Sequence, residues 1–197
     1  MRILGIDPGS RVTGYGVIDV DKGKETLVEY GVLRLDATKS HEVRLKQIYD
    51  RLSKVVARCL PDESAVEMPV YGKNPQAMLK LGRAQAAAML AVLNREISVV
   101  QYTPKEVKKS VCGNGNAAKE QVWFMVRSIL AIGEDAAGQK QTTHRKGKSN
   151  PIDSAAYDAT DALAVALCHA HRNTSPGASK HKDWSSFIRD NPDRISG

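Results

Sequence analysis

Hydrophobic residues at the start of the chain form three short runs that are separated by turn residues. The first run ends at Asp7, the second follows the turn residues Pro8 to Ser10, and the third covers residues 26–35. Short apolar runs with Pro and Gly between them are typical of strands joined by hairpins. The chain is therefore predicted to open with three antiparallel strands, and a carboxylate stands at the end of the first.

Beyond Ser40 the apolar residues recur mostly at helical spacing, and short strand-like runs interrupt them. Ser40 and Thr103 are suitable N-caps, and Pro104 occupies a first helical position. The pattern predicts helices over residues 41–60, 76–95, 104–112, 117–132 and 152–171, and strands over 64–68 and 97–102. This order indicates an α/β fold with a mixed, five-stranded central sheet flanked by helices.

Two polar segments complete the predicted organisation. Residues 133–151 are rich in Gly, Lys and Gln, which predicts a mobile surface loop. From residue 173 onward the chain is polar and contains Pro, Gly and Ser. We therefore expect a domain over residues 1–172 and a loosely ordered C-terminal tail over residues 173–197.

The composition narrows the classes of function. A chain of 197 residues is long enough for one domain with a sizeable core, and its formal net charge of +7 favours a polyanionic partner. The three cysteines show no CxxC spacing, which argues against a zinc site. Met1 leads directly into the first strand, and no apolar run reaches membrane-spanning length. We expect a soluble cytoplasmic protein.

Four carboxylates stand where they could meet. Asp7 and Glu67 end predicted strands, while Asp158 and Asp161 lie at i and i+3 on one face of the last helix, among small apolar residues. A carboxylate in apolar surroundings needs a partner or a metal ion. The alternatives are that Asp7 only caps its turn, that Glu67 faces solvent, and that the Asp pair forms a solvated acidic face.

Oxygen ligands alone favour Mg²⁺ or Mn²⁺ over zinc. A carboxylate cluster on a basic protein matches phosphodiester hydrolysis by two metal ions. The five histidines lie in polar or terminal contexts, so no Ser-His-Asp or Cys-His arrangement competes with this interpretation.

Several motifs occur in a specific order along residues 1–171. They are Gly5-Ile-Asp-Pro-Gly-Ser-Arg-Val-Thr-Gly-Tyr-Gly-Val17, Glu67, Lys73-Asn-Pro-Gln-Ala77, Leu81-Gly-Arg-Ala-Gln85, Val107-Lys108, Gly113-Asn-Gly-Asn-Ala-Ala-Lys-Glu-Gln-Val122 and Asp158-Ala-Thr-Asp-Ala-Leu163. Together they resemble the RuvC family of bacterial Holliday-junction resolvases, which belongs to the RNase H-like (retroviral integrase) superfamily.

The resemblance implies an RNase H-like fold and a homodimeric endonuclease of DNA recombination and repair. Asp7, Glu67, Asp158 and Asp161 would be its catalytic and metal-binding residues, with two Mg²⁺ ions, or Mn²⁺, in each active site. The enzyme would nick two strands of like polarity in a four-way DNA junction, leaving 5′-phosphate and 3′-hydroxyl ends. The family works with the RuvA–RuvB branch-migration complex.

The resemblance also implies residues that contact DNA. Lys108 and Lys119 match positions that the family uses against the phosphate backbone, and Lys119 lies in the first turn of a predicted helix, where a phosphate is favoured. Further backbone contacts are expected at Lys73, Lys80, Arg83 and Lys105, although each alone could be a solvated surface charge.

The chain departs from the family pattern at two places. Val70 stands where the family often has a base-stacking Phe, and Tyr71 beside it is expected to take over the stacking or, alternatively, to pack in its loop. The segment 133–151 is longer than expected, and its run His144-Arg-Lys-Gly-Lys148 is either a DNA contact or an ordinary exposed basic loop.

Two other functions remain open from the sequence. A nucleotide-handling ATPase of the sugar-kinase and actin type also opens with a strand, an Asp, a Gly-rich turn and a strand, but it needs a longer, two-lobed chain. A junction-binding protein without catalysis is the other. The dimer interface is expected on the apolar face of the helix at residues 76–95.

Overall fold

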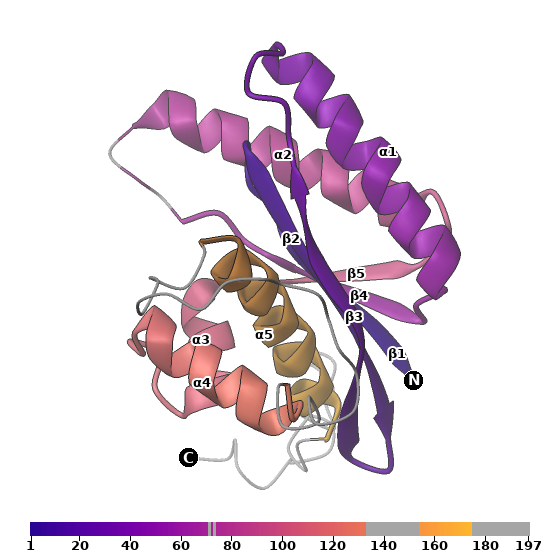
Figure 1. The fold of residues 1–197 in the computed structure, drawn as a ribbon, viewed down its shortest axis with the longest axis vertical. Coiled ribbons are helices and arrows are strands. Elements are labelled where there is room, and N and C mark those ends of the chain that lie inside the picture. The colour runs from indigo at the N-terminus through magenta and orange to yellow at the C-terminus, as the bar shows by residue number, and fades with distance from the viewer. Residues whose placement is uncertain (71, 73, 133–153, 175–197) are drawn as a thin grey trace, which may run out of the picture.

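The computed structural model describes residues 1–70, 72, 74–132 and 154–174. A mixed five-stranded sheet lies at its centre in the order β3-β2-β1-β4-β5 (Figure 1). Its strands are β1 (Arg2–Asp7), β2 (Val12–Asp21), β3 (Lys24–Arg34), β4 (Glu63–Glu67) and β5 (Ser98–Tyr102).

The first three strands form the predicted antiparallel meander, whereas β4 runs parallel to both β1 and β5. In the β1–β4 register, Ile6 is the partner of Val66. Asp7 and Glu67 are the next residues on the two strands, and parallel strands end at the same edge of a sheet. The parallel pairing therefore sets these two carboxylates side by side.

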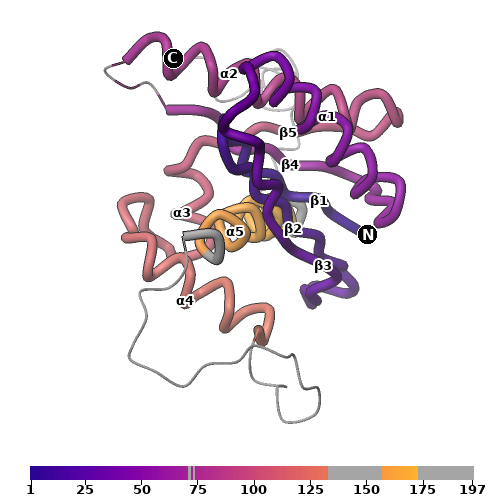
Figure 2. Tube along the Cα trace, turned by 45° about the horizontal axis from the view of Figure 1, so that its top comes forward, coloured from indigo at the N-terminus to yellow at the C-terminus, as the bar shows by residue number. Residues whose placement is uncertain are grey.

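Five helices of the described residues cover the sheet. Both views place α1 (His41–Cys59) and α2 (Pro75–Leu93) on one face, and α3 (Pro104–Cys112), α4 (Lys119–Ile129) and α5 (Ser154–Thr174) on the other (Figures 1 and 2). The predicted caps are confirmed. Ser40 Oγ accepts from the Val43 N–H, and Thr103 forms a reciprocal capping box with Glu106.

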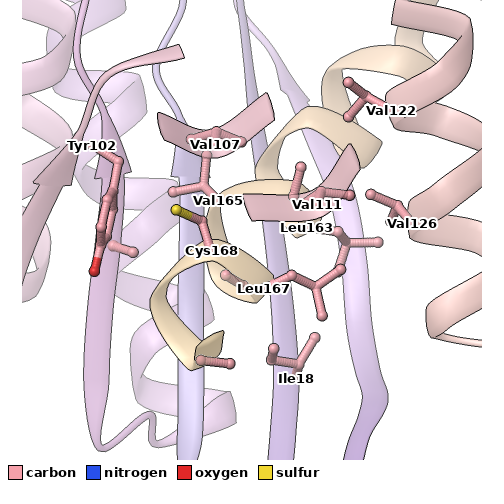
Figure 3. Packing of buried hydrophobic residues seen from close by; sticks show 14 of the residues in the cluster. Ile18, Tyr102, Val107, Val111, Val122, Val126, Leu163, Val165, Leu167 and Cys168 are labelled. Atoms are coloured by element: carbon pink, nitrogen blue, oxygen red, sulfur yellow. The ribbon is translucent and has the colours of Figure 1, made fainter. Parts of the chain in front are cut away.

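Each face of the sheet has its own hydrophobic core, because alternate residues of a strand point to opposite faces. Leu4, Ile6 and Val17 pack against α1 and α2. Ile3 and Ile18 belong to the other core, which is built around α5 and includes side chains of α3 and α4 (Figure 3). Odd-numbered positions of β1, Asp7 included, therefore face α5.

Helix α5 packs directly on the backbone of β1 and β2 because three glycines beneath it lack side chains. A Cβ atom on Gly5 would lie 2.1 Å from the Ala162 carbonyl oxygen, and one on Gly16 would lie 2.5 Å from Leu163. A Cβ on Gly14 would lie 2.0 Å from the carbonyl oxygen of Asp158. Small residues on α5 also permit this close packing. Ala159 and Ala162, both predicted to pack against the sheet, are buried.

The predicted elements are confirmed with small shifts at their ends. Helix α4 begins at Lys119 rather than at residue 117, because Ala118 is extended and serves as its N-cap.

Cys59 and Cys168 are buried and, like Cys112, form no disulfide. Within the described ranges, no helix is long and apolar enough to cross a membrane. The predicted loop at 133–151, with its basic run, and residues 175–197 of the predicted tail lie outside the described residues.

Candidate active site

Three of the four predicted carboxylates meet at one point. Oxygen atoms of Asp7, Asp158 and Asp161 all lie within 4.8 Å of one another. Asp7 comes from the end of the central strand β1, and the two other residues come from the helix that crosses it. The i, i+3 spacing on α5 directs both aspartates to the same face of the helix.

The register of the first hairpin explains why this meeting occurs. Asp7 is paired across the ladder with Gly14, and Gly14 is the residue whose missing side chain makes room for the backbone of Asp158. Gly14, the residue paired with Asp7, thus sets how closely α5 can approach the sheet at this point. A larger residue at this position would push Asp158 away from Asp7.

Glu67 lies next to this cluster but is not part of the group within 4.8 Å. It ends β4, and its position on the strand gives its side chain the same face as Asp7. Its backbone carbonyl accepts a hydrogen bond of 3.3 Å from Gln85 Nε2 on α2. Burial and the charges of Asp7 and Asp161 raise the pKa of Glu67 to about 8. The charge coupling shows that Glu67 belongs to the same electrostatic site.

Burial, followed by the charges of Asp161 and Asp158, raises the pKa of Asp7 to about 7. These carboxyls therefore retain protons near neutral pH when no cation accompanies them. A divalent cation would remove that cost, because it neutralises several carboxylates at once. The oxygen-only donor set of Asp7, Asp158 and Asp161, with Glu67 nearby, fits the hard cations Mg²⁺ and Mn²⁺.

Lys119 also reaches the cluster. Its Nζ lies 3.2 Å from Asp161 Oδ2. Lys119 is the first residue of α4, which confirms the prediction that it lies in the first turn of a helix. Burial opposes its charge, but the charge of Asp161 and the hydrogen bond to it, helped by Asp158 and Asp7, raise the pKa of Lys119. The ammonium thus supplies positive charge at the carboxylates and, being largely exposed, can also reach a phosphate.

The other predicted DNA contacts are spread over several elements. Lys108 on α3 is near enough for its charge to oppose the rise in the pKa of Glu67. Lys80 and Arg83 are exposed on α2, and Lys105 is exposed on α3. Tyr71 and Lys73 lie outside the described residues. Val70, which replaces the family's Phe, is 62% exposed.

Sequence reasoning gave no role to two residues that position the site. Gln85 holds the backbone at Glu67, and it also donates to Gln101 Oε1 at 3.0 Å. Gly14 sets the distance between β2 and α5. Both residues lie within motifs that carried the family resemblance, but spacing alone could not show what they contact.

Comparison with known proteins agrees with this geometry. The model of the family described as "Crossover junction endodeoxyribonuclease RuvC" matches residues 3–169. The chain belongs to the RuvC family. A crossover junction endodeoxyribonuclease RuvC from Salinibacter ruber is 54% identical over 196 residues, which cover 100% of this chain and 99% of the relative.

Solved structures of the RuvC family have the same fold. The Thermus thermophilus RuvC structure matches with a TM-score of 0.70 at 32% identity and covers 88% of this chain and 96% of that chain. A structure of T. thermophilus RuvC in complex with a Holliday junction substrate also matches with a TM-score of 0.70 at 32% identity, over 86% of this chain and 93% of that one. The α/β, RNase H-like fold and the family assignment made from the sequence are confirmed.

Proposed function

We propose that this protein is a Holliday-junction resolvase that hydrolyses phosphodiester bonds at the cluster formed by Asp7, Glu67, Asp158 and Asp161. The observation that supports this most strongly is the convergence of three carboxylates within 4.8 Å, beside a buried glutamate, in a chain of the RuvC family. The formal net charge of +7 suits a DNA substrate.

The four carboxylates would hold Mg²⁺, with two ions in each site and Mn²⁺ as a substitute. Such ions lower the pKa of bound water and neutralise charge on the phosphate and on the leaving oxygen. The chain's own part is to hold the donors in place. Strands β1 and β4 fix Asp7 and Glu67, and α5 brings Asp158 and Asp161 to them from one helix face.

The proposed reaction adds the oxygen of water to phosphorus and breaks the bond to the 3′ oxygen. The downstream fragment keeps the phosphate on its 5′ end. The leaving 3′ oxygen of the upstream fragment takes up a proton as the attacking water loses one, and it becomes the 3′-hydroxyl. Lys119, which lies beside Asp161, would attract the backbone phosphate toward the carboxylates. Lys108 would act from α3, where its charge reaches Glu67.

The test compares a labelled four-way junction with a linear duplex of the same sequence, with Mg²⁺ and with EDTA. We expect paired nicks only in the junction and only with the metal. The Asp7→Asn variant should bind the junction and fail to cut it, whereas the matched control Asp21→Asn, at the exposed end of β2, should cut normally. Retained cleavage by Asp7→Asn would refute the site assignment.

The same assay separates the other functions considered. Junction binding without nicks by the wild type would indicate a catalytically silent binder. An ATPase of the sugar-kinase and actin type is disfavoured by membership of the RuvC family over residues 3–169.

We propose further that two copies of the chain act together, because two symmetric nicks need two active sites. Helix α2 presents an apolar stripe to solvent on its outer face. Leu79 is 61% exposed and Leu90 51%, and Leu93 lies on the same face by helical spacing. This stripe agrees with the predicted interface on the helix at residues 76–95.

The dimer is tested by sedimentation. Leu90→Glu should shift the protein toward monomer and abolish paired nicking, while Leu60→Glu, which changes a residue that is 72% exposed outside α2, should do neither. An unchanged dimer in Leu90→Glu would exclude the α2 stripe. Cooperation with a RuvA–RuvB complex rests on family membership alone, and co-purification on junction DNA would test it.

A further inference from the structure

A groove of about 310 Å³ lies beside the candidate active site, where three elements meet. Ser10 and Arg11 come from the turn between β1 and β2, and Arg44 comes from the first turns of α1. Asn74 and Lys80 come from the beginning of α2. No residue of the groove is placed in the carboxylate cluster. Lys80 is among the DNA contacts predicted from the sequence, whereas Arg11 and Arg44 are not.

The groove is positively charged and lacks internal compensation. Its lining contains Arg11, Arg44 and Lys80 but no carboxylate. Within the part of the chain that the structure describes, these three side chains form no ion pair. Helix α2 adds the partial positive charge of its N-terminus, and its first turn contains no acidic residue that would cancel this charge.

Buried hydrogen-bonding atoms next to the groove are left without partners. Arg44 Nε is buried and makes no hydrogen bond in the described structure. Both ring nitrogens of His41, one turn earlier on α1, are likewise buried and unpartnered. Buried donors without acceptors are rare and destabilising, so a ligand that supplies acceptor oxygens would complete this corner of the fold.

The position of the groove restricts which ligand it would meet. Arg11 follows Asp7 by four residues, so their Cα atoms are at most roughly 14 Å apart. A duplex strand carries a phosphate for about every 3.4 Å of helix axis. A strand whose scissile phosphate lies at the carboxylates, and that runs toward the turn after β1, would bring another phosphate to the groove within about four nucleotides.

We propose that this groove binds a backbone phosphate of the junction arm next to the cleavage site, through Arg11, Arg44, Lys80 and the N-terminus of α2. The inference rests on the proposed junction-cleaving function and adds a second point of attachment to the DNA. The carboxylate cluster performs the hydrolysis. The groove fixes the register of the strand that crosses it, so that the intended phosphate reaches the carboxylates.

The first experiment measures junction affinity in EDTA over a range of salt concentrations. Arg44→Gln and Lys80→Gln should each weaken binding by about tenfold, as expected for loss of one charge-assisted phosphate contact. Each should also lower the slope of log K against log salt by about 0.9. Arg44→Lys should recover most of that slope, because it restores the charge.

The matched control is Lys54→Gln, which removes the same charge from an exposed position further along α1. It should leave both affinity and slope as in the wild type. Melting curves should first show that Arg44→Gln and Lys80→Gln are folded. If these two variants then have the same junction affinity and the same salt slope as Lys54→Gln, the groove does not bind DNA. If the wild type nicks no junction, the proposed function fails, and the affinity comparison still decides the groove.

The second experiment locates the phosphate. Junctions with single uncharged methylphosphonate linkages within four nucleotides of the cleavage site should lose affinity for the wild type at one or two positions. The Arg44→Gln, Lys80→Gln double variant should lose nothing further there. If no linkage matters, and inorganic phosphate at constant ionic strength raises the melting temperature of the wild type alone, the groove takes a free anion and the proposal is overturned.

Discussion

Substitution of Gly14 by Ala tests the central claim that α5 is positioned by the absence of a side chain beneath it. The added methyl group would lie 2.0 Å from the carbonyl oxygen of Asp158. This atom belongs to a helix backbone, so it cannot rotate away as a side chain would. To regain an ordinary contact of 3.4 Å, the helix must move by about 1.4 Å, or the hairpin must move with Asp7.

The effect of this shift can be sized in two ways. Overpacking of a filled core costs about 1–3 kcal/mol of stability. For a chain of this length, that loss corresponds to a fall in melting temperature of about 2–12 °C. A displacement of about 1 Å in a catalytic group typically costs about a hundredfold in rate. The fold should therefore survive in Gly14→Ala while cleavage is nearly lost.

The assay is single-turnover nicking of a labelled junction at saturating protein and Mg²⁺, well below the melting temperature, with junction affinity measured in EDTA. Gly14→Ala should bind the junction as the wild type does and cut it about a hundredfold more slowly. The control is Gly23→Ala in the turn between β2 and β3, where a Cβ would meet nothing within 4 Å. Its φ of +79° makes this substitution locally strained, but the added methyl group does not touch α5. This control should keep the wild-type rate and affinity.

Either of two results would refute the reasoning. Wild-type cleavage by Gly14→Ala would mean that the close approach of α5 does not set the geometry of the carboxylates. Equal losses of cleavage in Gly14→Ala and Gly23→Ala would mean that the effect is not specific to the contact with Asp158.

Three further predictions concern charge and stability. Because the folded-state pKa values of Asp7 and Glu67 are raised to about 7 and about 8, the metal-free protein should lose thermal stability as the pH rises from about 4 to 8, and Mg²⁺ should restore it. A melting temperature that climbs over this range in EDTA would contradict the assignment. Lys119→Met should cost at most about 1 kcal/mol of stability, because the ion-paired side chain is 62% exposed, yet reduce the salt slope of junction binding by about 0.9. An unchanged slope would argue against a phosphate contact. His169→Ala removes a buried hydrogen bond of 2.8 Å to the Tyr102 hydroxyl and leaves a cavity, so chemical denaturation should show a loss of about 2–4 kcal/mol, and a loss below about 1 kcal/mol would contradict this.

The sequence by itself determined the succession of strands and helices, because that succession depends on local patterns. The apolar run before Asp7 and the cap at Thr103 are properties of short segments. The four candidate carboxylates could also be named, since acidic residues among apolar ones are costly without a partner. The i, i+3 spacing of Asp158 and Asp161 was enough to place them on one face of α5.

The tertiary structure decided which of these residues meet. The parallel pairing of β1 with β4 sets Glu67 beside Asp7, although sixty positions separate them in the sequence. The depth of α5 on the sheet depends on Gly14, and the groove beside the site is assembled from three segments. Neither follows from local periodicity, because both depend on backbone distances between elements that only the packed core establishes.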